Sequence, residues 1–222
     1  MVLDYLKKEL FTSGQEPEFK LHEGSVFTAV ECADGHIGIC AAMDQGDGNL
    51  ADNYKKYIID QALINSMANR PELKYDDASF IDIIPLNEKN NIIMLGFIEP
   101  IYMQMNKKGI GCKVFDFRKK SPILSPLNEY DKSIEEGRTF IITATSLSNG
   151  SFDQLIQKAH KDADIYMIGP SAPMSRKIFD YAPQLKAVFG SIVKSKEAIG
   201  AIMDGAGTRT LSPFLRKASV IR

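Results

Sequence analysis

Residues 139–173 read TFIITATSLSNGSFDQLIQKAHKDADIYMIGPSAP, and they are the most informative part of the chain for its fold class. The apolar runs at 139–143 and 164–168 predict two short buried strands. Between them the spacing predicts a helix over 151–160, whose apolar side consists of Phe152, Leu155, Ile156 and Ala159. A strand, a helix and a second strand of these lengths predict a parallel sheet with helices on its faces.

The same alternation continues on both sides of this unit. Further short strands are expected at 91–96, 112–117 and 187–189, and further helices at 100–108, 172–181 and 195–203. At the start of the helix 151–160, Ser151 and Gln154 have the spacing of a capping box. Residues 88–222 are therefore expected to form a Rossmann-like, mostly parallel α/β domain.

The N-terminal part of the chain follows a different pattern. Its expected elements are a helix (2–14), a β-rich stretch (19–33), a partner strand (36–43), a glycine-rich loop (46–49) and a helix (50–68). Asp34 and Gly35 supply the turn between the two β segments. We expect a small α+β domain over residues 1–87, with the boundary in the polar, turn-forming stretch 85–91.

Composition excludes several classes of partner and location. Lys and Arg number 27 against 28 Asp and Glu, and no concentrated basic face is evident, so a nucleic-acid partner is not expected. The longest apolar runs are too short to cross a membrane, and the first residues lack the features of a signal peptide. The three cysteines are odd in number and widely spaced, which predicts no disulfide framework and a cytoplasmic, reducing location.

Four loops rich in small and polar residues are expected at one edge of the parallel sheet. They are residues 96–100, 144–151, 169–173 and 205–208. In an open parallel sheet, ligands bind at the carboxyl ends of the strands, near the point where the strand order reverses. The first three loops are expected to lead into helix N-termini, whose unpaired N–H groups suit a carboxylate or phosphate. The set predicts a ligand cleft, although each loop alone can be an ordinary turn.

The motifs of several well-known chemistries are missing from the sequence. Gly96 is followed by FIEP, so the dinucleotide fingerprint fails, and there is no P-loop lysine motif. Asp116 ends an expected strand where an acid could bind a ribose, which keeps a nucleotide-cofactor enzyme as an alternative. No G-x-S-x-G elbow is present, and Ser171 is explained more simply as a helix cap than as a nucleophile. The sequence identifies no catalytic residue and no cofactor.

The cysteines do not predict a metal site. A two-residue hairpin turn would pair Cys32 with Ile37 and Cys40 with Ala29, which places the two thiols on opposite faces of the hairpin. Cys112 lies in the other domain, and neither C-x-x-C nor H-x-x-x-H spacing occurs. We therefore expect no preformed metal site.

Two polar residues of the small domain stand among apolar neighbours. Thr28 lies in an apolar strand, and Asn65 follows Ile58 by seven positions and so shares the apolar side of its helix. A buried amide needs hydrogen-bond partners. Either these residues make structural hydrogen bonds within the domain, or both face the groove between the domains and touch ligand.

Three segments carry a family resemblance. Residues 149–155 (NGSFDQL), 168–174 (IGPSAPM) and 204–208 (DGAGT), in this order and spacing, resemble the "putative heavy-metal chelation" family of unknown function. The resemblance implies an N-terminal domain similar to that of enolase, joined to a Rossmann-like domain, with the active site between the two. The enolase likeness concerns the fold only, because the barrel that carries enolase chemistry is missing.

The resemblance also implies a set of ligand-binding residues. They are Thr28, Asn65, Asn149, Gly169, Pro170, Ser171, Gly207 and Thr208. We expect a protein, or an enzyme of heavy-metal homeostasis, that holds a small anionic molecule or a metal–chelator complex between the domains. A Rossmann-type nucleotide-cofactor enzyme and a non-enzymatic interaction protein are the alternatives. Folds of this kind commonly form homo-oligomers, but the sequence reveals no surface that would mediate one.

Overall fold

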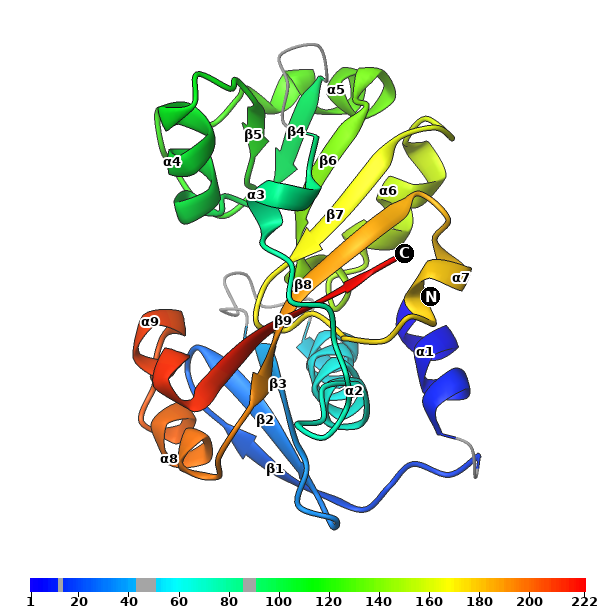
Figure 1. Ribbon diagram of the computed structural model, residues 1–222, viewed down its shortest axis with the longest axis vertical. Helices are drawn as coiled ribbons and strands as arrows, with labels where there is room; N and C mark the ends of the chain where they lie inside the picture. The colour runs from blue at the N-terminus through cyan, green and yellow to red at the C-terminus, as the bar shows by residue number, and fades with distance from the viewer. Residues whose placement is uncertain (12–13, 43–50, 86–90) are drawn as a thin grey trace.

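A six-stranded sheet forms the larger part of the molecule (Figure 1). The structure is a computed structural model, which describes residues 1–11, 14–42, 51–85 and 91–222. The strand order is β5-β4-β6-β7-β8-β9, in which the first five are parallel and the last is antiparallel to its neighbour. The strands are β4 (Ile92–Leu95), β5 (Lys113–Phe115), β6 (Thr139–Thr143), β7 (Asp164–Ile168), β8 (Leu185–Val193) and β9 (Leu215–Ile221). The expected Rossmann-like, mostly parallel fold class is confirmed.

Helices cover both faces of this sheet, because its central strands are apolar on both sides. One face packs against α5 (Tyr130–Glu136), α6 (Ser151–Lys158), α7 (Ile178–Tyr181) and α1 (Val2–Leu10). The other face packs against α3 (Phe80–Ile83) and α4 (Glu99–Lys107). Within the described ranges, no helix combines the length and apolar character that a bilayer crossing requires.

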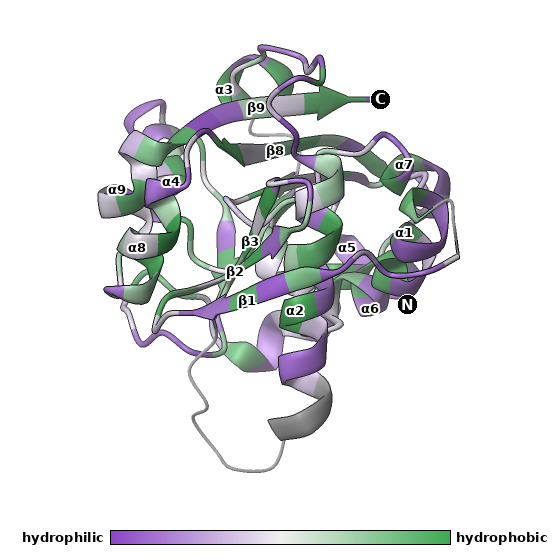
Figure 2. Cartoon of the chain, turned by 90° about the horizontal axis from the view of Figure 1, so that it is seen from below, coloured by the Kyte–Doolittle hydropathy of each residue, from purple (hydrophilic) through white to green (hydrophobic). Residues whose placement is uncertain are grey.

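A second, three-stranded antiparallel sheet lies below the first in Figure 1. It consists of β1 (Phe19–Glu23), β2 (Phe27–Cys32) and β3 (Ile37–Ala41). The long helix α2 (Ala51–Ala68) packs on one face, and the short helices α8 (Glu197–Met203) and α9 (Thr208–Leu211) pack on the other. Seen from below in Figure 2, β1 crosses in front of α2. This small sheet with α2 agrees with the small α+β unit expected from the sequence.

Several expected elements differ in extent. The stretch 19–33 is two strands, β1 and β2, joined by a tight turn at Gly24, where a Cβ atom would lie 1.9 Å from the carbonyl oxygen of Ile202. Helix α1 ends at Leu10 rather than at residue 14. Helix α5 and strand β9 were not expected from the sequence, because β9 alternates only weakly between polar and apolar residues on the edge of the sheet.

The helix expected over 172–181 is reduced to α7, residues 178–181. Residues 171–175 are buried, and backbone groups among them bond to Asn69, directly after α2. The amide N–H of Met174 donates to Asn69 Oδ1 at 2.8 Å, and Asn69 Nδ2 donates to the carbonyl oxygen of Ala172 at 2.9 Å. Tertiary hydrogen bonds therefore override the local helical pattern.

The hairpin register corrects the expected placement of the thiols. Thr28 lies opposite Cys40, and the N–H of Cys32 donates to the carbonyl oxygen of His36, so the turn has three residues rather than two. A shift of one residue moves a side chain to the other face. Cys32 and Cys40 consequently lie on the same face, against α2, and not on opposite faces.

The division at residues 87 and 88 stays a prediction. Helices α8 and α9 follow that boundary in the chain but pack on β1 and β2, while α1 precedes it but joins the core of the larger sheet. The polar stretch that marks the boundary falls partly, and the loop expected at 46–49 wholly, outside the described residues.

We predict that Gly38→Ala strongly destabilises the protein. A Cβ atom at Gly38 would lie 2.0 Å from the carbonyl oxygen of Ala62 and 2.1 Å from the amide nitrogen of Ser66, so β3 and α2 would have to separate. Overpacking of this kind costs about 1–3 kcal/mol or more. Gly200→Ala is the control, because no heavy atom lies within 4 Å of its Cβ position in α8. Urea denaturation should show a loss of stability for the first change and none for the second.

Candidate functional site

The strand order reverses between β4 and β6. From β4 the chain continues to β5 at one edge of the sheet, and from β6 it continues to β7 in the opposite direction. Ligands of open parallel sheets bind outside the carboxyl ends of strands at such a point. These ends face α2 and β3 (Figure 1). Two contacts join the parts: Gln61 Nε2 of α2 donates to the carbonyl oxygen of Ala144 after β6 at 2.9 Å, and the N–H of Ala41 donates to Ser171 Oγ at 2.8 Å.

Three buried carboxamides, two on one side of α2 and the third directly after its last residue, hold this junction together. Gln61, Asn65 and Asn69 are spaced by four residues, which places them above one another on a helix, and they are at most 3% exposed. Their side-chain NH₂ groups donate, at 2.7–3.0 Å, to the backbone carbonyl oxygens of Ile39, Ala144, Ser171, Ala172 and Ser191. We call these three residues the amide ladder. It satisfies carbonyl groups that would otherwise be buried without a donor.

Next to the amide ladder, hydroxyl and thiol groups gather around Cys40. Burial raises the pKa of the Cys40 thiol to about 12, against the opposing effect of the Ser148 and Ser171 side chains. Burial also raises the pKa of Tyr54 to about 12, and the nearby Arg118 guanidinium lowers it in part. Among the described residues, the buried Tyr54 hydroxyl makes no hydrogen bond of good geometry. The cluster is thus rich in neutral hydroxyl groups beside one exposed cation.

The loop after β5 brings Arg118 to this cluster. Asp116 organises the loop, because its two carboxylate oxygens accept backbone N–H groups from Phe97, Arg118 and Lys119 at 2.8–3.0 Å. Burial alone would raise the pKa of Asp116, but these three bonds lower it. Its oxygens are therefore engaged within the loop, which explains the acid at this strand end without a ribose.

Three of the residues expected to bind ligand are buried in this junction. Thr28 lies opposite Cys40 and is 5% exposed, Asn65 is 0% exposed and Ser171 is 2% exposed. Asn65 Nδ2 donates to the carbonyl oxygens of Ile39 (2.8 Å) and Ser171 (2.7 Å), so it makes structural bonds across the junction. Ser171 does not cap a helix, as α7 begins only at Ile178.

The remaining expected residues are more accessible. Gly169 and Pro170 are half-buried, and Gly169 has φ 148° with its Cβ position 3.3 Å from Ala144 Cβ, so close packing there favours glycine. Gly207 begins α9 beside exposed Thr208, and a Cβ atom at Gly207 would contact nothing within 4 Å. These two residues lie where α8 and α9 pack on the small sheet.

Asn149 is exposed and organises the start of α6. Its Oδ1 accepts the backbone N–H of Ser151 at 2.9 Å and the Ser151 hydroxyl at 2.7 Å. The helix cap is Gly150, and neither it nor Ser151 forms the expected capping box with Gln154. Asp153 in the first turn is also committed, since its Oδ1 accepts the N–H of Val2 and the Tyr181 hydroxyl. Asn149 therefore satisfies the N–H group of Ser151 at the N-terminus of α6, and Asp153 Oδ1 is engaged with α1 and α7.

The expectation that three loops lead into helix N-termini needs correction. The loop after β6 reaches α6 and the loop after β4 reaches α4, but α4 carries Glu99 in its first turn. The loop after β7 runs through residues 169–177 before α7 begins. Helix dipoles contribute less at this edge than the sequence suggested, and the positive charge comes from Arg118.

Sequence reasoning missed Gln61, Asn69, Tyr54 and Arg118. A signal existed for the first two, because carboxamides at 61, 65 and 69 recur every four residues on the apolar side of a predicted helix. Tyr54 and Arg118 are 64 positions apart, and no local pattern relates them.

The side chains do not fit a protein-built site for a soft metal ion. Such ions prefer grouped thiolates. Burial raises the pKa of Cys112 to about 11 and that of Cys40 to about 12, which disfavours the thiolate form. Across the described ranges, no group of three or more His, Cys, Asp or Glu residues is arranged to hold a metal ion.

Comparison with known proteins identifies similar sequences and structures. A family model named DUF364 and described as "Putative heavy-metal chelation" matches residues 79–221, and no curated protein matches the chain. A DUF364 protein of unknown function from Desulfitobacterium hafniense DCB-2 has a TM-score of 0.77 and 15% identity over 99% of each chain. Another, from Pyrococcus horikoshii, has the same score and identity over 100% of each chain. At this identity the likeness concerns the fold alone.

We predict that Asn65→Ala destabilises the fold by about 1–3 kcal/mol, the usual cost of leaving buried polar groups unsatisfied. The carbonyl oxygen of Ile39 would lose the donor that Asn65 supplies, and that of Ser171 would keep Gln61 alone. Asn106→Ala, at an exposed position of α4, is the control and should change stability by less than about 0.5 kcal/mol. Equal effects of both changes in chemical denaturation would contradict a structural role for Asn65.

We predict that the three thiols alkylate slowly in the native protein at about pH 8, because the thiolate is the reactive form and burial raises all three pKa values. Unfolding should restore an ordinary pKa near about 8.5 and rapid reaction. Because the folded protein holds these thiol protons more tightly than the unfolded chain, the free energy of unfolding should decline as the pH rises above about 8.5. Intact mass after iodoacetamide treatment, with and without urea, measures the labelling, and rapid native labelling of Cys40 would refute this picture.

Proposed function

We propose, since the chain belongs to the DUF364 family described as "Putative heavy-metal chelation", that it binds a small anionic molecule or a metal–chelator complex. The site is the junction between the carboxyl ends of β4–β7 and the face formed by β3 and α2. The ligand supplies the metal-binding groups, and the protein recognises the ligand. An enzyme acting on such a ligand would use the same site.

The buried Tyr54 hydroxyl carries this proposal. Among the described residues this hydroxyl makes no hydrogen bond of good geometry, although the Arg118 and Ser148 side chains lie near it. A buried hydroxyl in this position favours a group that it meets in the bound state. Arg118 lies beside it and has a planar set of donors that suits a carboxylate or phosphate. A hydroxyl group and a guanidinium group that lie side by side favour the binding of an oxyanion.

The protein side chains favour indirect recognition of metal. Cys40 is fully buried, and its raised pKa keeps the thiol protonated at neutral pH. A complex whose carboxylates surround the ion presents negative oxygen atoms outward, which are the groups that Arg118 and Tyr54 can bind. The engagement of Asp116 with its own loop argues against the nucleotide-cofactor alternative, in which this acid would bind a ribose.

We predict that Tyr54→Phe weakens ligand binding without weakening the fold. Citrate, alone and with Ni²⁺, is the probe, and isothermal titration calorimetry measures its affinity. Removing a hydroxyl that makes no well-formed hydrogen bond to the described residues should leave the free energy of unfolding unchanged or slightly raised. A loss of stability with unchanged citrate affinity would show that the hydroxyl is structural.

Arg118→Gln should weaken citrate binding by at least about tenfold, because a hydrogen bond to a charged group contributes about 1.5–3 kcal/mol. Lys132→Gln on α5 removes one exposed positive charge away from the site and serves as the control. If neither citrate nor its Ni²⁺ complex binds at millimolar concentration, or if both variants behave alike, a carboxylate chelator is not the ligand.

A further inference from the structure

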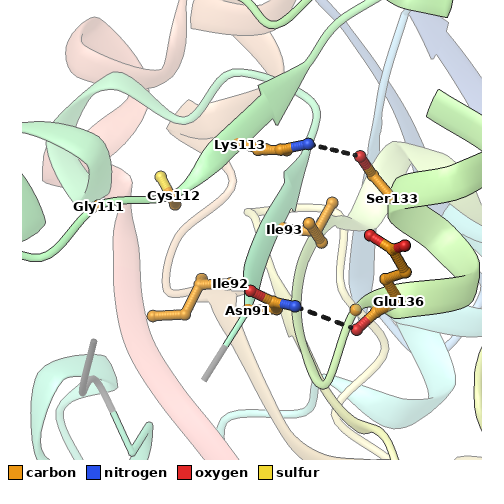
Figure 3. A pocket seen from close by; sticks show the side chains of 9 residues that line it. Asn91, Ile92, Ile93, Gly111, Cys112, Lys113, Ser133 and Glu136 are labelled. Atoms are coloured by element: carbon orange, nitrogen blue, oxygen red, sulfur yellow. Dashed lines mark hydrogen bonds between the residues drawn. The ribbon is translucent and has the colours of Figure 1, made fainter. Parts of the chain in front are cut away.

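A cavity of about 250 Å³ opens at the amino ends of β4 and β5, on the opposite edge of the sheet from the junction described above (Figure 3). Its lining comes from the starts of both strands and from the end of α5. The residues are Asn91, Ile92, Ile93, Gly111, Cys112, Lys113, Ser133, Glu136 and Gly137. The strands and the helix therefore bring three separate segments to one hollow.

One wall of the cavity carries both a positive and a negative group. Lys113 Nζ points to Ser133 Oγ at 3.4 Å (Figure 3), and it also contacts Glu129 Oε2 at 2.8 Å. These two bonds to described residues use two of the three donors of the ammonium group. Ser133 and Glu136 are three positions apart on α5 and so share a side of the helix. The ammonium and the Glu136 carboxylate consequently face the same hollow.

The ion pairs that these two groups already make are weak. Lys113 and Glu129 are 47% and 45% exposed, and Glu136 contacts Lys132 only at 3.7 Å. Exposed pairs of this kind contribute at most about 1 kcal/mol. Both charges can therefore exchange a present partner for a ligand at little cost.

The rest of the lining is apolar and the entrance is open. Ile93 pairs with Lys113, so its side chain shares the face that carries the charged groups, and it is 3% exposed. Ile92 and Cys112 line the rim of the cavity, but their side chains pack on the opposite face of the sheet. No heavy atom lies within 4 Å of the Cβ position of Gly111, so this residue borders free space. The volume is below the range of about 300–1,000 Å³ usual for drug-sized ligands.

We propose that this cavity binds a free α-amino acid with a small apolar side chain. Lys113 takes the carboxylate, Glu136 takes the ammonium group, and the side chain lies against Ile93. The paired charges select a zwitterion over a simple acid or amine, and the volume selects a small side chain. This site is separate from the one proposed for the anionic ligand.

L-Valine tests the proposal, with isovalerate and isobutylamine as probes that each lack one charge. In titrations followed by ligand-observed NMR, valine should bind, and each analogue should bind at least about tenfold more weakly, because it loses one charge-assisted contact. No valine binding at millimolar concentration, or equal binding of all three compounds, would overturn the proposal.

Variants then locate the binding. Lys113→Gln and Glu136→Gln should each weaken valine binding at least about tenfold, and Gly111→Phe should abolish it by filling open space. Lys8→Gln, at an exposed position of α1, and Arg118→Gln, in the other site, should leave it unchanged, with circular dichroism confirming that all variants fold. Valine binding that survives Gly111→Phe would place the site elsewhere. If citrate does not bind but valine does, only the proposal for the junction is contradicted.

Discussion

Gln61, Asn65 and Asn69 place a column of hydrogen-bond donors along α2, and the two sheets meet around it. The carbonyl groups that they satisfy belong to β3, to the loops after β6 and β7, and to β8. Those segments are far apart in the chain, and in the junction no water could replace the missing donors without opening it. The course of residues 169–177, the shortness of α7 and the position of Ser171 all follow from this column.

The amide ladder also divides the residues at the junction by role. Asn65 and the backbone of Ser171 are engaged in holding the two parts together, and Asp116 is engaged in shaping its own loop. Tyr54 and Arg118 are left with capacity to bind something else. The site that we propose would recognise oxyanions through hydroxyl and guanidinium groups, while its buried thiol stays protonated. That chemistry is compatible with a family named for metal chelation if the metal arrives already bound to a chelator.

Local sequence patterns predicted most of the strands and helices correctly, and the errors occurred where tertiary contacts or turn length changed the outcome. Strands β6 and β7 begin and end at the predicted residues, because each is a continuous apolar run bounded by turns. The hairpin register was wrong by one residue, since a three-residue turn and a two-residue turn have nearly the same sequence signal but place Cys32 on different faces. The capping box at Ser151 was wrong because Asn149 competes for the same N–H group. In the site, Asn65 was found from its position on an apolar helix face, but its role was left open between structure and ligand.

Hydrophobic period and turn residues act over a few neighbouring positions, so the amino-acid sequence was enough to predict the alternation of strands and helices, the fold class and the edge at which polar loops collect. Which of those polar groups are consumed by internal bonds, and which remain available, became clear only from the folded arrangement. That outcome depends on distances between residues far apart in the chain, such as Tyr54 and Arg118 or Asn69 and Met174, and no local pattern encodes them. Burial then set the pKa of each thiol, which a count of cysteines could not supply.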